Sequence, residues 1–216
     1  MPIYTPTSDK SFLAPFGPTL GHFKMDDDIV KNLNSMMSER LEDYSDQLVG
    51  KVSQELKFTD DIKKYLGNKL IQFLGEYHIW NLSRNSFGLH KHDYAKERYN
   101  LNIINGWFVR QFNNEYNPLH IHNDCELSCV GYLSLPDDID KEWEDDYKDH
   151  FPSNGHINFS YGVNNKYGCA NMLIKPRVGD FFVFPNYLFH CVYPFYSKGE
   201  RRSFSMNMVF EKTMIN

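Results

Sequence analysis

The sequence predicts an α+β fold in which N-terminal helices pack against an antiparallel β core. Up to residue 95, acidic helix starts and apolar residues at helical spacing predict two helices. From residue 96, short aromatic and β-branched segments separated by Gly, Pro and Asn predict an antiparallel sandwich or barrel. The length of 216 residues suits one domain. We therefore expect a single domain over 1–216, with a mainly helical part (1–95) and a β core that carries the site (96–216).

The two predicted helices span residues 25–44 and 59–80. Three aspartates at 26–28 suit the N-terminus of the first helix, because acids interact favourably with the helix dipole there. Thr59 is a plausible cap for the second. The preceding stretch, 12–25, has two Pro and two Gly among apolar residues, which predicts a loop with a short strand.

The predicted strands lie within six segments: 100–112, 127–136, 156–163, 171–185, 188–195 and 201–210. Side chains two apart on a strand share a face of the sheet. Trp107, Val109 and Gln111 would therefore share one face. Trp107, Gln111 and Asn207 are candidate lining residues of a pocket, although a structural role is the commoner one for such residues.

Composition gives no sign of a nucleic-acid partner or a membrane span, and it bears on the state of the cysteines. A net charge of -5 without a basic cluster gives no reason to expect nucleic acid. The longest apolar runs are far too short to span a bilayer. The four cysteines have no zinc-site spacing, and no signal peptide is recognisable, so we expect reduced thiols in a cytoplasmic protein.

The candidate site begins in "YNPLHIHND" (116–124), which crowds His120, His122 and Asp124 into five residues. If the chain is extended there, all three side chains share a face. His190 follows His122 by 68 residues, and Arg201 follows His190 by 11. A lone histidine on a strand is usually structural, but this ordered set is harder to explain without a ligand.

Non-haem Fe(II) oxygenases hold iron on one face, usually through two His and one carboxylate, which leaves positions for a cosubstrate and oxygen. The cosubstrate 2-oxoglutarate chelates iron with its keto acid end, and its far carboxylate needs a charged partner. Arginine matches a carboxylate with two parallel donors, and a nearby hydroxyl can add a hydrogen bond. Arg201 and Ser203 share a face on an extended strand, whereas Arg202 would point to the opposite face.

Three stretches, "NPLHIHNDCELSCVGYLSLP", "VGDFFVFPNYLFHCVYPF" and "ERRSFSMN", resemble the 2-oxoglutarate and Fe(II)-dependent oxygenase superfamily. More narrowly they are similar to oxygenases of marine phages and bacteria. The resemblance implies a double-stranded β-helix (jelly-roll) with Fe(II) between its sheets, and a setting in bacterial or phage-infected host cytoplasm. It also implies that Tyr132 could reach the 2-oxoglutarate carboxylate.

Several alternatives stay open. Two sets of metal ligands are possible. Both contain His122 and His190, and the third ligand is either His120 or Asp124. A cupin-type metal enzyme without 2-oxoglutarate and a non-catalytic jelly-roll module are the competing functions. The substrate, a small molecule or a peptide residue such as proline, is undetermined. The "HKHD" at 90–93 is read as a solvated loop, and the acidic stretch 136–150 as solvated or as a surface for a basic peptide.

Overall fold

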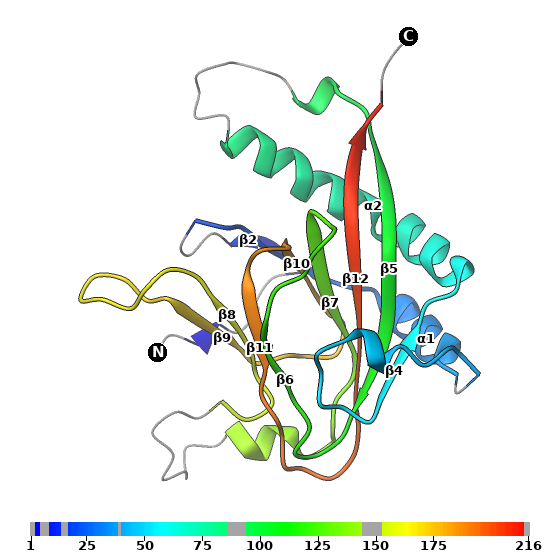
Figure 1. The fold of residues 1–216 in the computed structure, drawn as a ribbon, viewed down its shortest axis with the longest axis vertical. Helices are drawn as coiled ribbons and strands as arrows, with labels where there is room; N and C mark the ends of the chain where they lie inside the picture. Colours follow the sequence, from blue (N-terminus) through cyan, green and yellow to red (C-terminus); the bar gives the residue numbers. More distant parts are fainter. Residues whose placement is uncertain are drawn as a thin grey trace.

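The computed structural model describes residues 3–4, 9–13, 17–38, 40–85, 94–143 and 153–213. Within these ranges the chain forms two β-sheets, two α-helices and three short 3-10 helices (Figure 1). The helices are α1 (Asp27–Met36), α2 (Asp60–Asn85), η1 (Ser45–Gln47), η2 (Tyr94–Lys96) and η3 (Ile139–Trp143). Neither α-helix is apolar over a stretch long enough to cross a membrane.

The larger sheet has seven strands, each antiparallel to its neighbours. They are β2 (Lys10–Leu13), β3 (Leu20–Lys24), β4 (Gln54–Lys57), β5 (Tyr99–Gln111), β7 (Leu127–Ser134), β10 (Asp180–Pro185) and β12 (Arg201–Lys212). Their order across the sheet is β2-β3-β10-β7-β12-β5-β4. The long strands β12 and β5 pair from Arg201 and Gln111 to Lys212 and Tyr99, so they form a long ribbon on the β4 side of this sheet.

The smaller sheet has five strands and lies in front of the larger one in Figure 1. They are β1 (Ile3–Tyr4), β6 (Asn117–His120), β8 (Ile157–Ser160), β9 (Asn171–Ile174) and β11 (Phe189–Val192). The order is β1-β9-β8-β11-β6, in which β1 and β9 are parallel and the other pairs antiparallel. Strand β6 therefore lies at an edge of this sheet, beside β11.

Two apolar cores lie on opposite faces of the larger sheet. Alternate residues of β10 show the division, because side chains alternate across a strand. Phe181 and Val183 pack with residues of α1 and α2, whereas Phe182 and Phe184 pack with residues of the smaller sheet. The helices thus cover the outer face of the larger sheet, and its inner face is left for the site.

The prediction of helices packed on a mostly β chain is confirmed, and the cap at Thr59 is also observed, where Ile62 N donates to Thr59 Oγ1 at 3.4 Å. The N-terminal part is less helical than expected. Helix α1 ends at Met36, because the residues after it pair beside β4: Tyr44 N donates to Glu55 O at 2.8 Å. Strands β3 and β4, from this part, extend the larger sheet.

Candidate metal and cosubstrate site

A cavity of about 290 Å³ lies between the inner faces of the two sheets. Its lining comes from both sheets, including β5, β7 and β12 of the larger and β6, β8 and β11 of the smaller. His120, His122 and His190 line it, and so do Arg201 and Ser203. Residues far apart in the sequence therefore meet in one enclosed space.

The three histidines converge. The ligand nitrogens of His120, His122 and His190 all lie within 4.8 Å of one another, and Nε2 of His122 is 3.2 Å from Nε2 of His190. His120 and His190 face each other directly across the β6–β11 pair. Asp124 is exposed, with a backbone φ of 57°, and does not belong to this group.

Backbone carbonyls orient two of the rings. Nδ1 of His120 lies 2.7 Å from Pro118 O, and Nδ1 of His190 lies 2.9 Å from Leu188 O. A hydrogen on each Nδ1 satisfies these contacts, which leaves Nε2 unprotonated and available to a metal. His122 follows the end of β6 and is held through its backbone, which exchanges hydrogen bonds with Asn186.

Burial keeps the imidazoles neutral. It lowers the pKa of His190 well below the ordinary value, and the neighbouring His120 and His122 lower it further. Burial, with His120 nearby, lowers the pKa of His122 to about 4, and burial also lowers that of His120. Three neutral imidazoles whose lone pairs converge form a donor set that suits Fe(II).

Arg201 is completely buried on the cavity wall, at 1% exposure. Its guanidinium donates to Gly155 O at 2.7 Å, to Gln111 Oε1 at 2.6 Å and to Tyr193 O at 3.4 Å. Among the described residues no carboxylate forms an ion pair with it, and burial lowers its pKa. A buried charge without a counter-charge is costly. The cavity therefore offers an anion a cationic partner that forms no direct ion pair within the described part of the chain.

Two hydroxyl groups lie beside Arg201. Ser203 is on the same face of β12, and it pairs across the sheet with Tyr132 of β7. The Tyr132 hydroxyl is buried and has no hydrogen-bond partner among the described residues. Burial raises its pKa, and Arg201 opposes that shift. This orphaned donor lines the same cavity, where a ligand oxygen would satisfy it.

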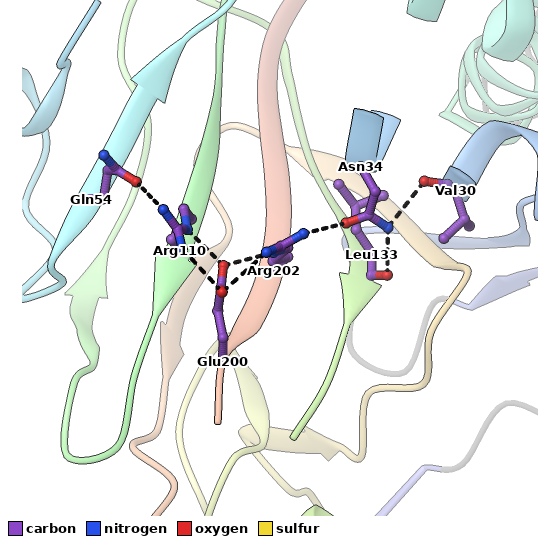
Figure 2. Close-up of polar contacts among 7 residues, drawn as sticks. All are labelled: Val30, Asn34, Gln54, Arg110, Leu133, Glu200 and Arg202. Carbon is purple, nitrogen blue, oxygen red and sulfur yellow. Dashed lines mark hydrogen bonds and ion pairs between the residues drawn. The ribbon is translucent and has the colours of Figure 1, made fainter. Parts of the chain in front are cut away.

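Arg202 points to the other face of β12, as strand alternation predicts. Figure 2 shows its guanidinium beside Glu200, with Nε 2.7 Å from Oε1, and reaching Asn34 of α1 at 3.4 Å. Arg110 binds the same carboxylate, with its own Nε 2.7 Å from Oε1. Arg202 therefore has an acid partner outside the cavity, which distinguishes it from Arg201.

The candidate lining residues Trp107, Gln111 and Asn207 all line the cavity. Sequence reasoning missed Glu55, which also lines it from β4. Strand β4 carries no alternating pattern, and the position of Glu55 depends on a pairing with β5 that local sequence does not reveal. The "HKHD" at 90–93 and residues 144–150 of the acidic stretch lie outside the described residues. The described part of that stretch is not among the cavity-lining residues.

A histidine cluster and a buried arginine share one cavity between the two sheets, an arrangement that suits a metal ion and an anionic ligand. Residues 105–207 match the family described as "Putative 2OG-Fe(II) oxygenase", and this segment includes every candidate residue named from the sequence. This segment of the chain is therefore similar to the 2-oxoglutarate and Fe(II)-dependent oxygenases. A search of curated proteins gives no significant match.

Solved structures are similar in fold. A 2OG-Fe(II) oxygenase family oxidoreductase from Burkholderia pseudomallei has a TM-score of 0.57 at 13% identity, covering 88% of this chain and 83% of that one. HygX from Streptomyces hygroscopicus, crystallised with nickel and 2-oxoglutarate, has 0.56 at 11% identity, covering 88% and 82%. A Pseudomonas putida prolyl-4-hydroxylase has 0.50 at 15% identity, covering 94% and 92%.

Proposed function

We propose that this protein is an Fe(II)- and 2-oxoglutarate-dependent dioxygenase that hydroxylates a C–H bond of its substrate, with residues 1–216 forming one domain around a double-stranded β-helix. The observation that carries this proposal is the presence of the histidine cluster and the buried Arg201 in one cavity. The fold likeness to enzymes of this class supports it.

In this proposal His120, His122 and His190 hold Fe(II), and Asp124 is spare. The convergence of three ring nitrogens favours this ligand set, because Asp124 is exposed, has a left-handed backbone conformation and does not join the cluster. The backbone carbonyls of Pro118 and Leu188 fix the ring orientations of His120 and His190, as expected of groups that support metal ligands.

Arg201 binds the far carboxylate of 2-oxoglutarate. It donates three hydrogen bonds to described residues, and a guanidinium has five N–H donors, so two have no partner within the described part of the chain and could serve a ligand. Ser203 and Tyr132 add hydroxyl groups at the same end of the cavity. The cupin-type alternative gives no task to this buried cation, and the non-catalytic alternative gives none to the histidine cluster.

When bound, iron and 2-oxoglutarate supply the oxidising chemistry, in which 2-oxoglutarate, O₂ and R–H give succinate, CO₂ and R–OH. The protein residues hold both groups, and the apolar wall that includes Val130 and Phe184 excludes water. Peptide and small-molecule substrates are both compatible with the site. A prolyl-4-hydroxylase and the hygromycin B-bound HygX are among the similar folds.

Iron binding tests the ligand set with a matched pair of variants. We expect His120→Ala to lose most Fe(II), because the site would keep only two ligands, and Asp124→Ala to keep one Fe(II) per chain. The measurement is metal content after anaerobic purification and reconstitution, with His190→Ala as the positive control for loss. Full iron content in His120→Ala and loss of iron in Asp124→Ala would show that Asp124, and not His120, is the third ligand.

A further inference from the structure

The cavity has a second polar end that iron and 2-oxoglutarate do not explain. Glu55 of β4 pairs with Val109 of β5, and Val109 pairs with Ser203 of β12. Side chains of residues paired in this way share one face of the sheet. Strands in a sheet are about 4.8 Å apart, so Glu55 lies two strands, or roughly 10 Å, from the Arg201–Ser203 end.

Glu55 is a buried acid without a counter-charge. It is 1% exposed, its Oε2 has no hydrogen-bond partner among the described residues, and no ion pair involves it there. Burial, with Asp43 nearby, raises its pKa to about 7. A cation bound beside the carboxyl group would compensate this cost, because an opposite charge favours the ionised form.

An amide adds an acceptor at this end. Oδ1 of Asn117 is buried without a partner among the described residues, and Asn117 lines the cavity. A Cβ built on Gly50 would meet Glu55 Oε1 at 3.0 Å and Asn117 Oδ1 closer still. The oxygens of Glu55 and Asn117 thus lie close together, packed against the backbone of Gly50.

Aromatic rings connect this end to the histidines. The ring centroids of Tyr44 and Trp107 are 5.9 Å apart, and those of Trp107 and His122 are 6.0 Å apart. Both aromatic residues line the cavity. Aromatic faces attract cations, and Trp does so most strongly. The space is small, since 290 Å³ is at the lower limit for ligand pockets, and 2-oxoglutarate occupies part of it.

We propose that the substrate inserts a protonated amine that binds Glu55 and Asn117 beside the rings of Tyr44 and Trp107. This inference rests on the proposed function and names its substrate class. A carboxyl group, an amide oxygen and two aromatic rings form a site for a cation with several N–H donors. The small volume admits a group of side-chain size, so the amine belongs either to a small alkylamine or to a lysine side chain of a peptide.

The test compares amines with neutral analogues of the same shape. Calorimetric titrations into the anaerobic Fe(II)–2-oxoglutarate protein use n-pentylamine against 1-pentanol, and acetyl-Gly-Lys-Gly-amide against its norleucine analogue. We expect at least one amine to bind tenfold or more tightly than its neutral analogue. Glu55→Gln, which keeps the shape, should abolish that preference. Asp43→Asn, which removes a nearby exposed charge that does not line the cavity, should keep it.

The outcomes separate this inference from the proposed function. Equal binding of amine and neutral analogue in both pairs overturns the inference, as does an amine preference that survives in Glu55→Gln. Titration of 2-oxoglutarate into the same preparations is the parallel measurement. If 2-oxoglutarate binds the parent and Glu55→Gln equally, the proposed function stands whichever way the amine result falls. If 2-oxoglutarate does not bind the parent, the proposed function itself fails. Preference for pentylamine or for the lysine peptide identifies the source of the amine.

Discussion

Replacing Arg201 tests whether the buried guanidinium is the 2-oxoglutarate anchor. Arg201→Met keeps the length and apolar bulk of the side chain but removes its charge and its donors. Two of the five donors have no partner among the residues that the structure describes. A hydrogen bond to a charged group contributes about 1.5–3 kcal/mol, and each 1.4 kcal/mol is a factor of ten in affinity. We therefore expect a loss of roughly tenfold for one bond and about a hundredfold or more for two.

The assay is anaerobic titration of 2-oxoglutarate into the Fe(II) protein, followed through the charge-transfer band of the metal chelate. Arg202→Ala is the matched control, because Arg202 adjoins Arg201 in sequence but binds Glu200 outside the cavity. It should leave the affinity nearly unchanged, and both variants should keep full iron content. Arg201→Lys, which keeps the charge without the planar fork, should fall between parent and Arg201→Met. Equal affinities of Arg201→Met and parent would refute the assignment.

Two further predictions concern buried groups on the inner face of the larger sheet. Tyr132→Phe removes one hydroxyl and should weaken 2-oxoglutarate binding by several-fold to about tenfold, since a neutral hydrogen bond contributes about 0.5–1.5 kcal/mol. An unchanged affinity in the same titration would show that the hydroxyl does not contact the cosubstrate. Glu55→Gln should make stability less dependent on pH. The pKa of Glu55 is about 7 in the folded protein and 4.5 in the unfolded chain, so the folded state binds the proton more tightly. The free energy of unfolding of the parent is therefore greatest below pH 4.5, and it falls by up to roughly 3 kcal/mol as the pH rises from 4.5 to 7. Urea unfolding of both proteins at pH 5 and pH 8 measures this, and a pH-independent difference between them would contradict it.

Strand alternation predicted the Arg201 end of the site. Arg201 and Ser203 lie within a long regular strand, so their shared face follows from local sequence. The choice between His120 and Asp124 could not be made in this way. Strand β6 ends at His120, and the following residues leave the strand, with Asp124 in a left-handed conformation. The assumption of an extended chain therefore fails between these two residues.

The remaining differences have a non-local origin. Glu55 lies on a strand of four residues whose place beside β5 is set by pairing with a distant segment. Likewise the first helix was predicted too long, because its last residues have helical spacing but bond to β4 instead. Local propensity is a weak guide where tertiary hydrogen bonds compete with it.

The carboxylate of Glu200, held between Arg110 and Arg202, bears on the fidelity of folding (Figure 2). Arg201 and Arg202 are adjacent on β12 and lie on opposite faces of the strand. If the pairing of β12 with its neighbours shifted by one residue, Arg202 would enter the cavity and Arg201 would leave it. The shift would also move Arg202 from its place opposite Arg110, where one carboxylate joins both side chains. The triad thus favours the observed pairing of β12, and we expect a protein that lost it to form the alternative pairing, with the wrong arginine facing the histidine cluster.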